Sequence, residues 1–437
     1  MSDVEYLSAA AAAAELGVSL ATLYAYASRG MLRSEPVPGE PRARRYPRED
    51  VLRLKERKEL RRDPERAAER AAPRALHWGA PVLESAITLV EGGRLYYRGR
   101  DVVELSRTAS VEEVAALIWT GDPTAAGAIF AESAGTSGEE SAGASLETAG
   151  TFLLSMLEVL DEVGLSPVER CQLAVPLAGT ADLAAWDLRP RSVAACGVRI
   201  LRLLAMVLAA QPAAAESPAS PPPRPGTSIA TLLQQGWSPG RPQAARPLGA
   251  ALVLCADHEL NVSAFTARCV ASAAATPWDV VGAGLAALKG GKHGGYADRV
   301  EALFREAGTP EAARRALADR LRRGEEVPGF GQPLYPQGDP RGRELLALAA
   351  AAAPGSPAVT LAEALAAAAR ELIGELPTLD FGLVALARAL ALPAGAPLAL
   401  FALGRSIGWI GHALEEYALD RLIRPRAAYV GERPARS

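Results

Sequence analysis

The chain has 437 residues, of which 49 % are hydrophobic and 5 % aromatic, and its formal net charge is −3. This length predicts two or three domains, because a single hydrophobic core rarely serves more than about 250–300 residues. The near-neutral charge excludes a uniformly basic nucleic-acid binder, so any contact with DNA must be confined to one part of the chain. The many alanines and few aromatic residues favour close-packed helices over sheets.

The N-terminus, MSDVEYLSAA, has neither the basic nor the apolar region of a signal peptide. No uninterrupted apolar run reaches the roughly 18 residues of a membrane span, so we expect a soluble, cytoplasmic protein. The cysteines lie in apolar helical context without C-x-x-C spacing, which favours buried, reduced thiols over a metal site or a disulfide. They are Cys171, Cys196, Cys255 and Cys269.

Residues 6–29 predict two short helices, because an alanine run is followed by a break at Gly17-Val18-Ser19 and then by apolar residues at helical spacing. Ser19 has the side chain of an N-cap for the second helix. Residues 31–62 predict two short extended pieces around a Pro/Gly turn, and then a charged helix. Between residues 29 and 62 there are twelve basic and six acidic residues, so this region is locally basic.

This pattern resembles the winged helix-turn-helix of the MerR and excisionase type, with Tyr46 and EDV at 49–51 closing the wing. The resemblance covers about 60 residues and implies a DNA-binding domain over residues 1–70. It places one group of side chains near the major groove and another on phosphates of duplex DNA. The first group is Thr22, Tyr24, Tyr26 and Arg29, and the second is Arg42, Arg44 and Arg45. The alternative is a small interaction module whose arginines are simply solvated.

From about Arg74 onward the chain becomes apolar and alanine-rich, with Gly and Pro between the helical segments. Residues 124–145 and 210–228 look like loops or tethers; the second is too rich in Pro, Ala and Ser to pack. We find no fixed-period repeat and no alternation of strands with helices. The body is therefore expected to be all-α, without a doubly wound sheet.

Three clusters of polar residues interrupt this apolar body. They are CADHELNVSAF (255–265), ALKGGKHGGYADR (287–299), and the loop VPGFGQPLYPQGDPR (327–341) together with LPTLDFG (376–382) and the segment 401–429. The loop cannot be a helix, because Pro333, Pro336 and Pro340 each remove a backbone donor. Each cluster has a structural alternative: a histidine can cap a helix, GGKHGG can be a plain turn, and Asp380 can N-cap the helix that follows.

Taken in this order and spacing, the segments from about Trp78 to the C-terminus resemble the citrate synthase family. The segments ADHELN, ALKGGKHGG, GFG…GDPR, LDF and GRSIGW…RPR match its successive active-site blocks. The resemblance implies a nearly all-helical fold. Its large domain would span residues 74–290 and 396–437, and its small domain residues 291–395. The two domains close on the substrate and exclude water.

The resemblance also implies roles. Asp380 matches the base that takes a proton from the acetyl methyl group, and His293 matches the donor to the thioester oxygen. Arg341, Arg405 and Arg424 match the clamp for the dicarboxylate, with the last reaching in from the partner subunit of a homodimer. The resemblance also implies that His258 and Asn261 bind the substrate. It implies that Gly329, Gly331 and Lys292 bind CoA. No metal and no cofactor beyond the CoA thioester is implied, and no membrane partner.

Gln332 departs from the family pattern, which has a histidine directly after GFG. That histidine binds the keto oxygen and supplies positive charge as the alkoxide forms. Glutamine keeps an N–H donor but cannot carry charge near neutral pH. Loss of an oxyanion donor typically costs about 10²–10³ in kcat, so a neutral replacement should cost up to that range. The family often has a basic residue on this loop near the CoA phosphates, where this chain has LYPQG.

Two hypotheses of different classes follow. The first is a condensing enzyme that joins acetyl-CoA, or a related acyl-CoA, to oxaloacetate or a related 2-oxo acid. The retained base, enol donor and arginines favour it. The second is a dimeric DNA-binding regulator that uses a citrate synthase body as a sensor of CoA thioesters or keto acids. The helix-turn-helix and Gln332 favour this second hypothesis.

Overall fold

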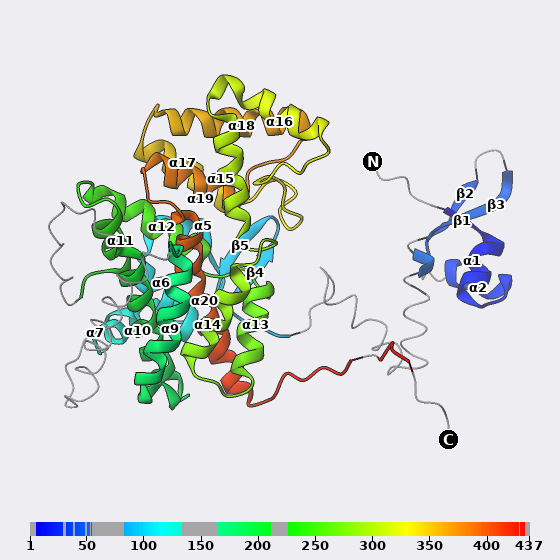
Figure 1. Cartoon of the computed structure of the whole chain (residues 1–437). Coiled ribbons are helices and arrows are strands. Elements are labelled where there is room, and N and C mark those ends of the chain that lie inside the picture. The colour runs from blue at the N-terminus through cyan, green and yellow to red at the C-terminus, as the bar shows by residue number, and fades with distance from the viewer. Residues whose placement is uncertain are drawn as a thin grey trace. The chain divides into compact units, whose positions relative to one another are not determined.

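The computed structural model describes residues 6–28, 32–37, 40–48, 50–52, 54, 83–132, 164–210, 226–427 and 429–432, without the side chains of residues 40–43. The chain forms two compact units, residues 1–84 and 85–437 (Figure 1). We call the first the N-terminal unit and the second the body, and each is described by itself.

The N-terminal unit consists of two helices and a three-stranded antiparallel sheet. The elements are β1 (Tyr6–Ser8), α1 (Ala9–Leu16), α2 (Leu20–Ser28), β2 (Glu35–Val37) and β3 (Glu40–Pro47), with strand order β1-β3-β2. Gly17 ends α1 in the left-handed conformation, with φ 59°. The side chain of Ser19 accepts a hydrogen bond from Thr22 N at 3.2 Å, which confirms the predicted N-cap. The helix–turn–helix and the β2–β3 wing are therefore present as predicted.

One element of this unit was missed. Residues 6–8 were predicted as the start of a helix, but they form β1, whose Leu7 lies opposite Tyr46 of β3. Tyr46 and Val51 are fully buried in the core that joins the wing to α1 and α2. Pairing with β3 outweighs the helical propensity at residues 6–8, since β1 covers an otherwise open sheet edge.

The body is built mostly of helices. Its elements are β4 (Thr88–Glu91), β5 (Arg94–Tyr97), β6 (Arg100–Asp101), α5 (Val102–Thr108), α6 (Val111–Thr120), η1 (Pro123–Ala125), α7 (Ala126–Glu132), α9 (Pro167–Ala181), η2 (Leu183–Trp186), α10 (Pro190–Ala209), α11 (Ile229–Trp237), η3 (Pro242–Ala244), α12 (Ala245–Cys255), α13 (Val262–Ala271), α14 (Pro277–Leu288), α15 (Tyr296–Ala307), η4 (Pro310–Ala312), α16 (Ala313–Arg322), α17 (Pro340–Ala352), α18 (Pro357–Ile373), α19 (Leu379–Ala389) and α20 (Ala396–Leu419). Several helices begin at capping boxes that are visible in the sequence, such as Ser110–Glu113 and Ser166–Glu169.

Helix α20 forms the centre of the body (Figure 1). Its side chains are buried almost continuously from Ala396 to Ala413, and it contacts α6, α10, α12, α13 and α14. Glycines allow close approach: a Cβ on Gly284 would lie 2.5 Å from the Trp409 ring. A separate core cluster forms at the end that contains α15, α16 and α18, and includes Phe304, Leu365 and Phe381. The bounds of a large and a small domain stay a prediction.

Three expectations from the sequence can be compared with this structure. Residues 124–132 are helical, in η1 and α7, so the predicted tether at 124–145 is wrong there, and 133–145 lie outside the described residues. Residues 211–225 of the second predicted tether also lie outside them. The four cysteines are free, and three are buried. Among the described residues, no group of three or more His, Cys, Asp or Glu could hold a metal.

Helix α10 is long and apolar enough to cross a membrane by length and composition, although no uninterrupted apolar run was found in the sequence. In the structure 67 % of its apolar window is buried within the body. It packs against α9, α11 and α20. Two bent helix pairs in the described part of the chain also pass the same test when each pair is taken as one span, Ala9–Leu16 with Leu20–Ser28 and Val111–Thr120 with Pro123–Ala131.

Candidate functional site

The loop at 327–341 is irregular, as predicted, and it lies beside the start of α19. Gly331 N donates to Leu376 O at 3.0 Å, and Thr378 N donates to Gly329 O at 2.9 Å. Gly329 has φ 91°, and a Cβ there would lie 3.1 Å from the Phe381 ring. Glycine is therefore needed at this contact. The pairing brings together two segments predicted to carry the site.

Asp380 lies in the first turn of α19, but it does not cap the helix. Thr378 occupies the N-cap position, so the capping alternative for Asp380 is wrong. Its Oδ1 is buried and has no hydrogen-bond partner among the described residues. Burial raises the pKa of Asp380 to about 6, and the nearby Arg341 opposes that shift. A carboxylate in this state can act as a base near neutral pH.

His293 lies in the glycine-rich turn between α14 and α15, and its Nε2 is 2.9 Å from Ser263 Oγ. The same hydroxyl is 2.7 Å from Asn261 Oδ1. A hydroxyl has one proton, so Ser263 can donate to only one of the two, and its orientation sets which ring nitrogen of His293 bears the proton. Burial, with the charge of Arg405, lowers the pKa of His293 to about 4. His293 is thus uncharged at neutral pH, and it can donate to a ligand from Nδ1 only when the Ser263 hydroxyl donates to Nε2.

Asn261 caps α13. Its Oδ1 accepts hydrogen bonds from Ser263 N and Ala264 N, and its Nδ2 donates to His258 O. This side chain therefore shapes the turn that carries the site, and its predicted role in substrate binding stays a prediction.

Arg341 is buried in the first turn of α17, and its guanidinium is already engaged. Nε donates to Asp339 Oδ1 at 3.0 Å and Nη2 to Asp339 Oδ2 at 2.8 Å. Asp339 also caps α17 and accepts from Leu379 N. The predicted fork for a substrate carboxylate is thus held by Asp339, and Nη1 makes no described hydrogen bond.

Arg405 is buried in the middle of α20. Its Nε donates to Cys255 O at 2.8 Å, and its guanidinium lies 4.8 Å from the Phe401 ring centroid. It forms no ion pair with any described carboxylate within 4.0 Å. A buried guanidinium in this state is suited to an anionic ligand.

His258 follows the end of α12. Its Nε2 lies 2.8 Å from Tyr335 Oη. Burial and the charges of Arg341 and Arg405 lower the pKa of His258 well below its ordinary value, so the ring is neutral. Gln332, on the same loop as Tyr335, is partly buried, and its Oε1 is 3.5 Å from Leu334 N. The amide N–H₂ of Gln332 makes no hydrogen bond to any described residue.

Several residues that hold these groups were not among the predicted site residues. Asp257 is fully buried, with Oδ1 3.1 Å from His412 Nε2 and Oδ2 2.6 Å from Thr88 Oγ1. Burial would raise its pKa, but His412 keeps the pKa of Asp257 below the ordinary value. Tyr97 Oη bonds to both N and O of Asp257. Asp257 stood in the first polar cluster, yet nothing in the sequence linked it to a histidine 155 residues away.

Tyr335 and Asp339 could have been found. An aromatic residue at the centre of a Gly/Pro loop is unusual, and Asp followed by Pro is the signature of an N-cap with Pro at the first helical position. Other predicted residues are not brought to the site by any described contact: Arg424 lies exposed after α20, and Lys292 is exposed in the turn before His293.

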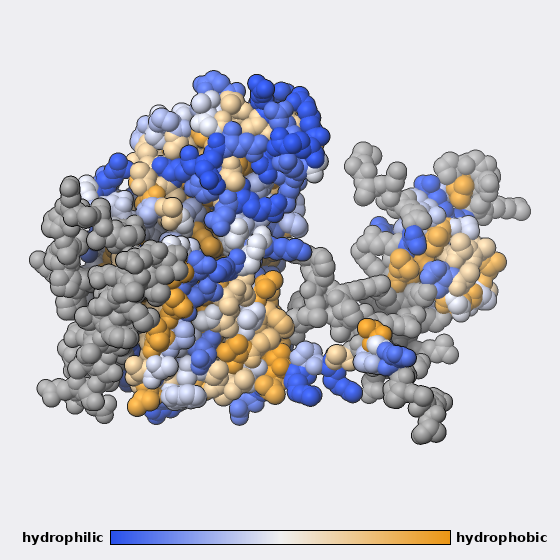
Figure 2. All heavy atoms as spheres, viewed as in Figure 1, coloured by the Kyte–Doolittle hydropathy of each residue, from blue (hydrophilic) through white to orange (hydrophobic). Residues whose placement is uncertain are grey.

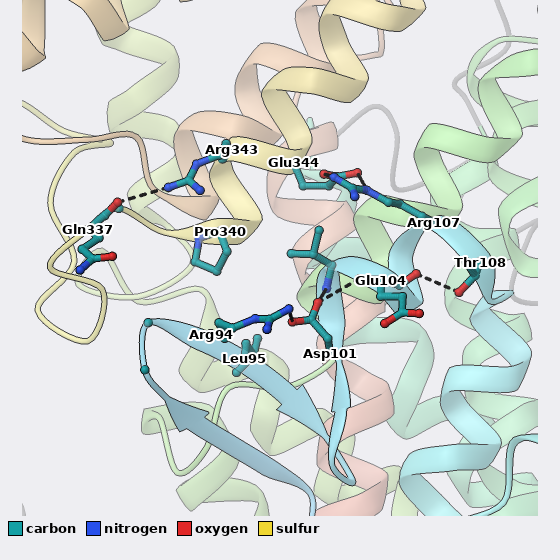
Figure 3. A pocket seen from close by; sticks show the side chains of 14 residues that line it. Arg94, Leu95, Asp101, Glu104, Arg107, Thr108, Gln337, Pro340, Arg343 and Glu344 are labelled. Carbon is teal, nitrogen blue, oxygen red and sulfur yellow. Dashed lines mark hydrogen bonds and ion pairs between the residues drawn. The ribbon is translucent and has the colours of Figure 1, made fainter.

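A cavity of about 570 Å³ adjoins the loop (Figure 3). It is lined by the β4–β5 turn, by α5 and by residues 337–344. Arg94 pairs with Asp101, and Arg107 pairs with Glu344. Arg343 donates to Gln337 O at 3.2 Å and has no described carboxylate partner, so its charge is available to a ligand.

The N-terminal unit presents some of the predicted DNA-binding residues. Tyr24 is 50 % exposed, whereas Tyr26 packs partly into the core and Thr22 bonds to Ser19. Arg44 is exposed and donates to Ser34 Oγ at 2.7 Å. Arg45 pairs with Glu35 and stacks on Tyr6, at 4.0 Å from the ring centroid. Arg29 and the side chain of Arg42 lie outside the described residues.

Both parts of the chain match models of known protein families. The family model described as "Citrate synthase, C-terminal domain" matches residues 75–426, and the model described as "MerR HTH family regulatory protein" matches residues 7–63. The chain is 31 % identical over 374 residues to a citrate synthase of Haloferax volcanii, which covers 81 % of this chain and 95 % of that protein. It is 30 % identical over 358 residues to 2-methylcitrate synthase 2 of Corynebacterium glutamicum, with coverage of 78 % and 90 %.

Solved structures agree on the fold. Citrate synthase from Thermotoga maritima aligns with a TM-score of 0.65 at 23 % identity, over 82 % of this chain and 96 % of that one. The Thermoplasma acidophilum enzyme, solved as a ternary complex with carboxymethyl coenzyme A and oxaloacetate, aligns with a TM-score of 0.64 over the same shares. The N-terminal unit carries a MerR-family helix-turn-helix domain, and the chain belongs to the citrate synthase family.

Proposed function

We propose that the protein is a citrate synthase-type acyltransferase. It would condense acetyl-CoA, or a related acyl-CoA, with oxaloacetate, or a related 2-oxo acid, to give CoA and a citrate-type product. The observation that carries the proposal is Asp380, whose buried Oδ1 has no described partner and whose pKa is raised to about 6. Groups with perturbed pKa values in such surroundings are typical of catalytic sites.

The chemistry would run as follows. Asp380 takes a proton from the acyl methyl group, and neutral His293 donates a hydrogen bond to the thioester oxygen as the enolate forms. The enolate carbon attacks the keto carbon, where the Gln332 amide donates to the developing alkoxide. Arg405 binds a carboxylate of the keto acid. The alkoxide takes up one proton, equivalent to the one that Asp380 accepted, and becomes the hydroxyl of the product. Water then hydrolyses the thioester to a carboxylate, and CoA leaves as the free thiol.

The acyl-CoA thioester is itself a substrate, and we propose no further cofactor. The loop offers no basic residue between Gln332 and Gln337, so the CoA phosphates need cations from elsewhere. The cavity in Figure 3 adjoins this loop. Of the arginines that line it, Arg343 has no described carboxylate partner. We assign Arg343 to the phosphates on these grounds.

The test of the proposed function is release of free thiol from acetyl-CoA on addition of oxaloacetate to the purified full chain. Thiol release that requires both substrates and is absent in Asp380→Asn supports it. Absence of thiol release from acetyl-CoA and propionyl-CoA with a panel of 2-oxo acids would refute it.

A cytoplasmic homodimer is part of the proposal. Apolar side chains gather over α9, α13 and α14 (Figure 2), and Leu183 and Trp186 of the adjoining η2 are 80 % and 67 % exposed. Large exposed apolar residues on neighbouring elements are typical of a subunit interface. A second copy of the chain is the occupant that the family resemblance implies.

We expect Leu183→Asp with Trp186→Asp to convert the dimer into monomers, because a carboxylate buried at an apolar interface is left unpaired. Sedimentation velocity measures the change. Leu321→Asp, an exposed leucine on α16, is the matched control and should stay dimeric. A double variant that sediments as the parent does would place the interface elsewhere.

The second candidate function is a DNA-binding regulator with a citrate synthase body as its sensor. The observation in its favour is the MerR-family match over residues 7–63, together with Gln332 in place of a group able to carry charge. The enzyme should release thiol from acetyl-CoA, whereas a sensor without catalysis should not. Both functions can occur in one protein if the enzyme also binds DNA.

For DNA, we expect Arg44→Ala to weaken binding of the full chain to duplex DNA and to reduce the salt dependence, because each phosphate contact releases counterions. One lost contact per chain is two per dimer, which should lower the magnitude of the log–log slope by about 1.8. Fluorescence anisotropy at several salt concentrations gives both values. Arg314→Ala, an exposed arginine of the body, is the control. An unchanged slope for Arg44→Ala would exclude Arg44 from the phosphate contacts.

A further inference from the structure

Tyr335 makes a contact that none of the roles above uses. Its hydroxyl lies 2.8 Å from Nε2 of His258, across 77 residues of sequence, and its side chain is only 2 % exposed. The Arg341 guanidinium lies 5.5 Å from the centroid of its ring. Its backbone N donates to Gln332 O at 2.8 Å, so Tyr335 ends the turn that begins at Gln332. The loop is thus attached to His258 through one hydroxyl.

The chemistry of His258 requires a partner at this atom. The ring is neutral between Arg341 and Arg405, so one nitrogen bears a proton and the other accepts. A carboxylate ligand offers only acceptors, so His258 can serve it only by donating from Nδ1. Nε2 must then be the acceptor, and it needs a donor. Tyr335 Oη is the described group within hydrogen-bond distance of Nε2.

We propose that Tyr335 is a positioning residue for His258: its hydroxyl donates to Nε2, keeps the proton on Nδ1, and so prepares the histidine to bind a carboxylate of the keto acid. The inference rests on the proposed function for the identity of that ligand. Because Tyr335 acts through His258, its removal should weaken keto-acid binding much more than it slows the chemical step.

The experiment is a double-mutant cycle on oxaloacetate binding, measured by calorimetry with the full chain and no acyl-CoA. Tyr335→Phe keeps the buried ring and removes only the hydroxyl. We expect its Kd for oxaloacetate to rise about tenfold, as for loss of one hydrogen bond to a buried polar group, and its kcat to fall less than about threefold. In a His258→Ala background, Tyr335→Phe should cause no further loss, because the group it supports is gone.

The control is Tyr417→Phe, which also removes a partly buried hydroxyl, one that donates to Ala275 O, and should leave the Kd unchanged. An equal loss from Tyr335→Phe in both backgrounds would mean that Tyr335 supports the fold and not His258, and it would overturn the inference. Equal affinity of Tyr335→Phe and the parent would overturn it too, while thiol release would still test the proposed function separately. If the parent chain neither bound oxaloacetate nor released thiol, both the inference about Tyr335 and the proposed function would be wrong.

Discussion

Asp380→Asn is expected to lower kcat for acetyl-CoA and oxaloacetate by about 10²–10⁴-fold, the usual contribution of a general base. The amide is nearly isosteric with the carboxylate but cannot accept the methyl proton. Binding of oxaloacetate alone should change little, because we assign its carboxylates to Arg405 and His258 and not to Asp380. Steady-state kinetics and calorimetry on the same preparation separate the two effects. Asp298→Asn, an exposed carboxylate in the first turn of α15, should keep parental kinetics.

Asp380→Asn should also be more stable than the parent at high pH. The pKa of Asp380 is raised to about 6 in the folded chain, above the ordinary value of 3.8. An acid with a raised folded pKa contributes stability below its unfolded pKa, and that contribution is lost as pH rises through the folded pKa. Asp380→Asn should therefore raise the free energy of unfolding at pH 8, on the order of 1–3 kcal/mol, and show little gain near pH 4.

The raised pKa of Asp380 also predicts how the reaction depends on pH. A base must be deprotonated to act, so the parental kcat/KM should rise with pH around 6 and then level off. His293, with a pKa of about 4, stays neutral over that range and adds no further step. A variant that condensed the substrates at the parental rate would show that Asp380 is not the base.

Gln332→His is expected to raise kcat for acetyl-CoA and oxaloacetate by about tenfold, with a smaller change in the KM for oxaloacetate. In the proposed mechanism glutamine would donate one neutral N–H to the keto oxygen, whereas histidine could also carry positive charge. That charge matters most as the alkoxide forms, and less in the bound ketone, so the gain should appear in kcat. A Cβ on Gly331 would lie 2.8 Å from the Glu375 carboxylate, so the space beside Gly331 is already filled and the ring must fit where the Gln332 amide lies.

Gln337→His is the matched control, because it adds a histidine to the same loop on the side of the cavity in Figure 3. It should leave kcat unchanged. If Gln332→His folds properly and its kcat is equal or lower, the pocket is arranged around glutamine. A different keto acid, or the sensing role, would then account better for the site.

Local features of the fold could be predicted because their causes lie within a few residues. Ser19 and the Gly17 turn separate α1 from α2, and capping boxes begin α6 and α9. The polar run after Cys255 ends α12, and Asn261 starts α13. The prolines and glycines at 327–341 exclude regular structure. Propensity, capping and turn chemistry act over one helical turn, so the sequence displays them directly.

The same limit explains the errors. Strand β1 forms only because β3 provides a partner, and α7 forms in a segment whose small residues looked like a tether because it packs against α6 and α10. In both places tertiary packing outweighs local preference. Strand β3 and helix α10 are too distant in the sequence to be seen in a local pattern.

By itself, the sequence determined the family and the helical class, and it predicted the residue types of the candidate site: Asp380, His293, His258, Arg341 and Arg405. The tertiary structure alone decided the state of each group. It joins Arg341 to Asp339, Tyr335 to His258 and Asp257 to His412, and it leaves Oδ1 of Asp380 without a described partner. The reason is physical: burial and hydrogen-bond partners set protonation and orientation, and partners 77 and 155 residues away are assigned only when helices pack around α20.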